Sequence, residues 1–203
     1  SWSFPGGTPA TSASNNPTVK YSSTGEFSVS LIVSNAKGTD TLELLNYVVV
    51  AEPEAGLAST WGDSFENTIF PNNGLVVDNP DMGITWERTT DASVDGEASV
   101  RIQNAININY GQSDALVLPR LDFTAYPSPI KMAFKWAYAR GDANYSDELI
   151  VLVSSDCGTT WSQRFYKTGS ALATGPTQTS LFVPNKSQLK LATIDLSTYA
   201  TSN

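Results

Sequence analysis

The chain of 203 residues contains no histidine and a single cysteine, Cys157. Without histidine it cannot build an HExxH zinc site, a Ser-His-Asp triad or a Cys-His dyad from its own residues. One cysteine also excludes an internal disulfide. Catalysis by paired carboxylates, as in glycoside hydrolases, stays open on composition alone. The composition therefore argues against most hydrolytic chemistry, and we expect no enzyme activity from this chain.

Positive charge is scarce as well, because 12 Lys and Arg stand against 20 Asp and Glu, giving a net charge of −8. This balance argues against binding to nucleic acid or to an anionic membrane. No apolar run reaches the ~20 residues of a transmembrane helix, and we recognise no signal peptide. The first residues read as the middle of a strand, so we interpret the chain as a processed or excised piece.

Helical periodicity is also missing, and the alternation typical of strands takes its place. Within residues 1–50, Phe27, Val29, Leu31 and Val33 fall on one face of an expected strand. Residues 51–60, mostly small residues with Pro and Glu among them, predict a linker.

From residue 61 onward, short expected strands are separated by polar turns, and we predict an all-β sandwich or jelly roll for 61–203. In the clearest of them, Phe134, Trp136 and Tyr138 share one face. The expected strands are 63–65, 85–88, 98–102, 115–118, 131–138, 148–154, 160–167 and 190–195.

Residues 1–50 resemble a PKD domain, an immunoglobulin-like β-sandwich. The resemblance is carried by Trp2–Gly7, by Asn16-Pro17 with Val19 and Tyr21, and by Val29–Asn35 followed by Gly38. It covers only the later part of such a domain, because two strands would precede Trp2. Either sequence outside this chain completes the sandwich or its sheet edges stay open, in which case dimerisation or strand exchange would cover them.

Residues 61–203 resemble the jelly-roll modules that follow PKD domains in secreted bacterial metallopeptidases of the pappalysin type. They are also similar to the cleaved-adhesin domains of gingipains and, more distantly, to MAM domains. Such a jelly roll continues past Tyr199 with further strands, so this unit also reads as incomplete. The motifs that carry the resemblance are Asp63–Glu66, Asn79–Asp81 with Trp86, Gly111–Leu116, Tyr145–Leu149 and Ser154–Trp161.

The resemblance implies a structural calcium ion in the second unit. Related modules use an acidic residue of the first strand, which points to Asp63 and Glu66, and Asp147 opens a central strand beside an acidic loop. Calcium accepts six to eight oxygen ligands without strict geometry, so loop carboxylates and carbonyls suit it. The plainer interpretation is that all three are hydrated turn residues.

Aromatic side chains offer a second kind of site, because flat rings stack on sugars. Trp136 and Trp161 lie in strand patterns and are expected in the core, which leaves Trp86 and Tyr110 as surface candidates. Cys157 lies in an Asp-Cys-Gly turn, and we expect a buried or half-buried inert thiol there. Asp147 and the neighbouring Glu148 point to opposite faces of a strand, which is poor geometry for an acid–base pair.

These patterns predict a non-catalytic accessory or adhesion region of a secreted bacterial multidomain protein, with a zinc metallopeptidase as the expected parent. The expected partners are an extracellular protein substrate, the cell surface or other domains of the parent, and not nucleic acid. The alternative is a carbohydrate-binding module of a polysaccharide-degrading enzyme, with glycan as its partner.

Overall fold

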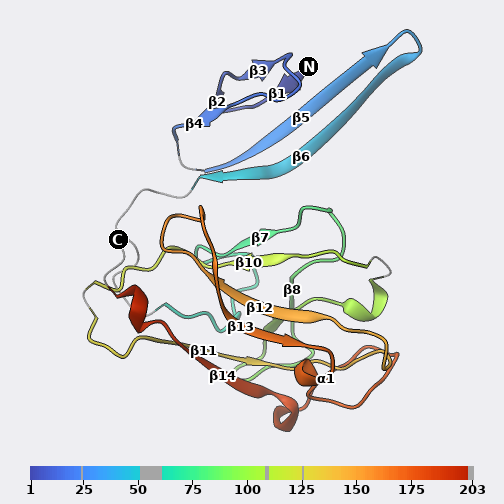
Figure 1. Ribbon diagram of the computed structural model, residues 1–203. Helices are drawn as coiled ribbons and strands as arrows, with labels where there is room; N and C mark the ends of the chain where they lie inside the picture. The colour runs from blue at the N-terminus through green and yellow to red at the C-terminus, as the bar shows by residue number, and fades with distance from the viewer. Residues whose placement is uncertain (24, 51–60, 108–109, 125, 201–203) are drawn as a thin grey trace. The chain divides into compact units, whose positions relative to one another are not determined.

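The computed structural model describes residues 1–23, 25–50, 61–107, 110–124 and 126–200 (Figure 1). The chain divides into two compact units, Ser1–Glu54 and Ala55–Asn203. In the described residues strands dominate, and the longest helix, α1 (Gly169–Leu172), has four residues, so the predicted all-β class is confirmed. The predicted linker, 51–60, lies outside the described residues.

The first unit is built on a four-stranded antiparallel sheet with the order β3-β1-β5-β6. Two further short strands, β2 and β4, pair with each other in a separate antiparallel sheet. The strands are β1 (Trp2–Ser3), β2 (Gly7–Thr8), β3 (Thr11–Ser12), β4 (Lys20–Tyr21), β5 (Gly25–Asn35) and β6 (Gly38–Val50).

The core of the first unit gathers at the base of the β5–β6 hairpin. Phe4 and Val29 are buried there, and the rings of Tyr21 and Phe27 lie 4.7 Å apart. Farther along the hairpin, Val33 is half exposed although the alternation places it on the same face as Val29. The predicted strand face is therefore correct, but only its proximal part is covered within this unit.

The second unit is built from antiparallel strand pairs (Figure 1). Each pair is regular except β12–β13, whose register shifts between Val151 and Leu152. The pairs are β7 (Val76–Asp78) with β10 (Ala115–Val117), β8 (Glu87–Thr89) with β9 (Ser99–Arg101), β11 (Lys131–Trp136) with β14 (Lys190–Asp195), and β12 (Glu148–Val153) with β13 (Ser162–Thr168).

The core of the second unit lies between the two longest strand pairs. Ile130, Ile194 and Leu196 are buried, and apolar residues of β11, β12 and β13 pack against them. The ring of Phe165 meets Phe134 edge-on at 5.3 Å and Trp136 at 5.4 Å. Strict alternation of exposed and half-buried residues along β11 and β12 confirms the predicted period of two.

Two predictions about the second unit are wrong in detail. Residues 63–65 form no strand, because Phe65 has a φ of 62° and its amide donates to Asp63 Oδ1. Trp161, expected in the core, is 53% exposed because it stands at the end of a tight turn, ahead of β13. Strand β7 was not expected from the sequence.

Candidate binding site

One group of hydrogen-bonded polar side chains lies where β11 ends and β12 begins, and it centres on Asp147. The Tyr138 hydroxyl donates a 2.6 Å hydrogen bond to Asp147 Oδ2, and Asn104 Nδ2 donates to the same oxygen at 3.2 Å. Burial, followed by this bond to the carboxylate, raises the pKa of Tyr138 well above its usual range. The Asp147 carboxylate therefore joins the start of β12 to Tyr138, nine residues earlier, and to Asn104, 43 residues earlier.

Backbone contacts hold the same end of the unit together. The amide of Gly169, at the start of α1, donates to the Asp147 carbonyl at 3.1 Å. Thr174 donates its amide to the Tyr138 carbonyl at 2.8 Å, and its hydroxyl oxygen accepts the Tyr138 amide at 3.0 Å. Trp136 Nε1 donates to the Leu172 carbonyl. The site thus stands on ordered strand and helix ends rather than on an isolated loop.

The loop between Tyr138 and Asp147 is braced by its own side chains. Arg140 donates to the carbonyl oxygens of Tyr145, at 3.0 Å, and Ala143. Asp142 Oδ1 accepts the amide of Asn144 at 2.6 Å. Arg140 and Asp142 therefore both make hydrogen bonds within their own loop.

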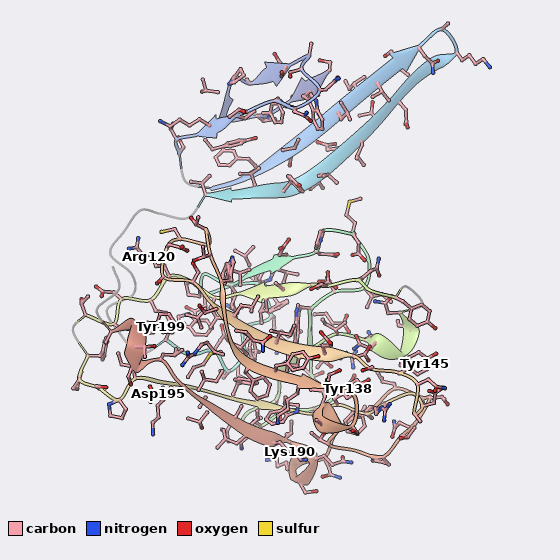
Figure 2. All side chains as sticks on the ribbon, in the orientation of Figure 1. Arg120, Tyr138, Tyr145, Lys190, Asp195 and Tyr199 are labelled. Atoms are coloured by element: carbon pink, nitrogen blue, oxygen red, sulfur yellow. The ribbon has the colours of Figure 1, made fainter. Side chains whose placement is uncertain are left out.

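Two tyrosines form an exposed aromatic ledge beside this loop, the Tyr110–Tyr145 ledge. Their ring centroids lie 6.4 Å apart with an interplanar angle of 16°, and Tyr110 is 80% and Tyr145 41% exposed. Tyr145 lies against the backbone of Gly141, where a Cβ would stand 3.1 Å from Tyr145 Cδ2. Figure 2 shows Tyr145 and Tyr138 on the same side of the second unit.

The surroundings of the ledge are negative. Hydrogen bonding with Tyr110 raises the pKa of Tyr145, and the charges of Asp142 and Asp147 raise it further. Tyr110, one of the two predicted ligand-binding residues, is part of the ledge. Its partner Tyr145 was missed, because a lone tyrosine in a polar loop gives no periodic signal that it stacks on a residue 35 positions away.

Trp86, the other predicted aromatic contact, is only half exposed. Its Nε1 donates to the Asp114 carbonyl at 3.3 Å, which ties the indole to the start of β10. Burial raises the pKa of Asp114, and the charges of Asp81 and Asp78 add to this. The structure does not bring Trp86 and Tyr110 together as a stacked pair.

The predicted calcium ligands Asp63 and Glu66 each hold backbone in place. Asp63 Oδ1 accepts the Phe65 amide at 2.6 Å. Glu66 Oε1 accepts the amides of Glu97 and Ala98, both at 3.0 Å. In residues 1–23, 25–50, 61–107, 110–124 and 126–200, no three His, Cys, Asp or Glu side chains form a group suited to a metal ion. Asp63, Glu66 and Asp147 are therefore not gathered into one acidic site.

The Asp-Cys-Gly turn is confirmed, but the environment predicted for its thiol is wrong. Cys157 has a φ of 56° and its side chain is exposed. The turn is held by Asp156, which accepts the Thr160 hydroxyl at 2.5 Å and the Thr160 amide at 2.8 Å. The sequence did not anticipate a left-handed backbone at this non-glycine residue or the exposure of its side chain.

Comparison with known protein families gives a match only for the first unit. Residues 1–48 match the family described as PKD domain. No curated protein and no solved structure matches the chain. PKD domains are extracellular adhesion or accessory domains of a non-catalytic type, so the first unit is similar to domains that make contacts rather than catalyse reactions. No helix in the described ranges is long and apolar enough to span a membrane.

Proposed function

We propose that this chain is a non-catalytic accessory region of a secreted bacterial multidomain protein and that it binds protein or a cell surface. The observation that carries the proposal is the match of residues 1–48 to the PKD domain. The parent that the second unit's motifs suggest is a zinc metallopeptidase, in which this region would space domains and contact substrate.

The second unit is proposed to be a jelly-roll module of the adhesin type, spanning 61–203. Support comes from its antiparallel strand pairs around one aromatic and aliphatic core. The chemistry of the described residues agrees with a binding role. Carboxylates such as Glu66 and Asp147 accept hydrogen bonds that fix backbone and neighbouring side chains, as structural groups do.

Calcium is proposed as a stabilising ion of this unit. Because the acidic side chains are not grouped, an ion at Asp63, Glu66 or Asp147 would take most of its ligands from carbonyl and amide oxygens and water. Calcium would have a structural and not a catalytic role, because an ion that binds the folded state stabilises that state against unfolding.

Carbohydrate binding is the second candidate function, and the Tyr110–Tyr145 ledge is the observation that favours it. Two exposed, nearly parallel rings offer a flat face for a sugar. Trp86 adds less support than the sequence suggested, since its indole is tied to the Asp114 carbonyl.

Probing the purified chain against an array of extracellular matrix proteins and a glycan array separates the two functions. The accessory function predicts saturable binding to protein spots and none to glycans. Glycan binding that disappears in Tyr110→Ala, with no protein binding, would replace the first proposal by the second.

A further inference from the structure

We propose that the Tyr110–Tyr145 ledge, together with the carboxylate of Asp142, binds a lysine or arginine side chain of a basic partner protein. This inference rests on the proposed binding function and names the chemistry of the partner at one surface. Three observations support it: the two aromatic rings are exposed, the charge near them is negative, and Arg140, the one cation of the loop, is already occupied by hydrogen bonds.

The ledge exposes aromatic rings to which a cation can bind. Tyr110 is 80% exposed, and its ring lies nearly parallel to that of Tyr145. The ring of Tyr145 lies next to Gly141, where a Cβ would stand 3.1 Å from Tyr145 Cδ2, so no side chain separates the ring from the loop at this point. The π-face of an aromatic ring carries a negative quadrupole that attracts a cation within about 6 Å of the ring centre.

The second step is the charge around the rings. The loop that ends at β12, residues 140–147, contains two carboxylates, Asp142 and Asp147, whose charges both act on Tyr145, and one cation, Arg140. In the part of the chain that the structure describes, neither carboxylate forms an ion pair, because both ion pairs found there belong to Arg101. This excess of negative charge favours a cation over a neutral sugar.

The third step concerns Arg140, whose guanidinium would otherwise fill the site. Its donors point to the carbonyl oxygens of Tyr145 and Ala143, so it braces the loop and leaves the carboxylates and rings for an external cation. The chain uses the same contact elsewhere, since Arg164 lies 5.6 Å from the centre of the Tyr199 ring. Figure 2 shows Tyr199 on the opposite side of the unit from Tyr145.

The charge of the whole chain supports the same partner. A net charge of −8 attracts basic proteins over distances set by the ionic strength. A single exposed cation–π contact contributes only modestly, so the ledge would act as one specific contact within a larger electrostatic encounter.

The test is an NMR titration of the full 203-residue chain, in EDTA, with the peptide acetyl-tetra-arginine amide. The matched probe is the tetra-citrulline peptide, which has nearly the same shape without charge, and maltotetraose and cellotetraose probe the sugar alternative. The tyrosine ring signals are followed in wild type, Tyr110→Ala, Asp142→Asn and Tyr47→Ala. Tyr47 is the control because it is 62% exposed but belongs to the first unit.

The proposal predicts saturable shifts of the Tyr110 and Tyr145 rings with tetra-arginine and none with tetra-citrulline. Tyr110→Ala and Asp142→Asn should each weaken the affinity about two- to fivefold, while Tyr47→Ala should leave it unchanged. Asp142→Asn retains an oxygen for the Asn144 amide, so its effect reports charge rather than folding.

Equal responses to the charged and neutral peptides, or no effect of either ledge variant, would overturn the proposal. Saturation by a tetrasaccharide instead would assign the ledge to glycan. Failure of this titration would leave protein binding on the array intact, so the ledge and the general binding function are tested separately.

Discussion

The hydroxyl of Tyr138 lies 2.6 Å from Asp147 Oδ2 and joins the end of β11 to the start of β12. The phenol is half-buried, so removing its hydroxyl leaves the carboxylate with one donor fewer in a partly desolvated place. Tyr138→Phe should lower the free energy of unfolding by about 1–3 kcal/mol. Urea denaturation at pH 7 measures this directly.

Tyr166→Phe provides the matched control, because Tyr166 also donates a 2.6 Å hydrogen bond to a carboxylate, that of Glu148, but is 42% exposed. The free energy of unfolding should fall clearly less in Tyr166→Phe than in Tyr138→Phe. The raised pKa of Tyr138 also sets a pH dependence. The unfolded state loses this proton first, so the stabilisation is complete below about pH 10 and decreases as the pH rises further. Equal losses in the two variants would refute the assigned role.

Gly96 lets the carboxylate of Glu66 reach the backbone of the following residues. It has a φ of +67°, and a Cβ there would stand 2.4 Å from Glu66 Oε1. Gly96→Ala should therefore both strain the backbone, by about 1–2 kcal/mol, and displace the carboxylate from the Glu97 and Ala98 amides. The change in thermal midpoint measures the sum.

Gly111→Ala separates these two contributions. Gly111 has a φ of +75° with nothing near its would-be Cβ, so its variant carries the backbone strain alone. Gly96→Ala should be the more destabilising variant, and the excess reports the Glu66 contact. Identical midpoints for the two variants would show that the contact contributes nothing.

The pKa of the Asp156 carboxyl group can be measured by carbon NMR. Hydrogen bonds from the Thr160 hydroxyl and amide, with a further one from Ser154, lower its pKa to about 2. Because the folded value is depressed, the turn gains stability above the ordinary value of 3.8 and loses it as the pH falls through about 2.

Thr160→Val removes the hydroxyl but keeps the amide, so the pKa of Asp156 should rise toward its ordinary value. Ser154→Ala should raise it less, because the Ser154 hydrogen bond is the weaker cause. If Asp156 titrates at its ordinary pKa in the wild type, the turn is not held as described.

Calcium binding predicts a rise in the thermal midpoint of several degrees when the EDTA-treated chain receives the ion, since a ligand of the native state stabilises it by mass action. Magnesium is the control, because it demands a tighter octahedral site. Asp147→Asn and Glu66→Gln would locate the ion. An unchanged midpoint in calcium would remove the ion from the account.

How far the sequence predicts this molecule depends on the range of the interactions. Alternation along β11 and β12 predicts both strands and their faces, because burial on one side of a sheet imposes a period of two. Phe65, by contrast, is pulled out of the expected strand when its amide turns to the Asp63 carboxylate. Such a local hydrogen bond overrides propensity and is invisible to periodicity.

The candidate site shows the same limit. Tyr110 was predicted as a surface aromatic residue once Trp136 and Trp161 were assigned to strands, whereas Tyr145 becomes significant only through its position against Gly141 and Tyr110. Glu66 was predicted as a metal ligand, and the structure adds that its carboxylate accepts two amides 31 and 32 residues away. Long-range partners of this kind are set by the fold and leave no local pattern.

The most direct test of the central claim measures binding of the whole chain side by side on extracellular protein and glycan arrays, at low and high salt. We expect saturable, salt-sensitive binding to basic proteins that is weakened in Tyr110→Ala and Asp142→Asn and retained in Tyr47→Ala. Binding to glycans alone, or no binding to any protein at low salt, would contradict it.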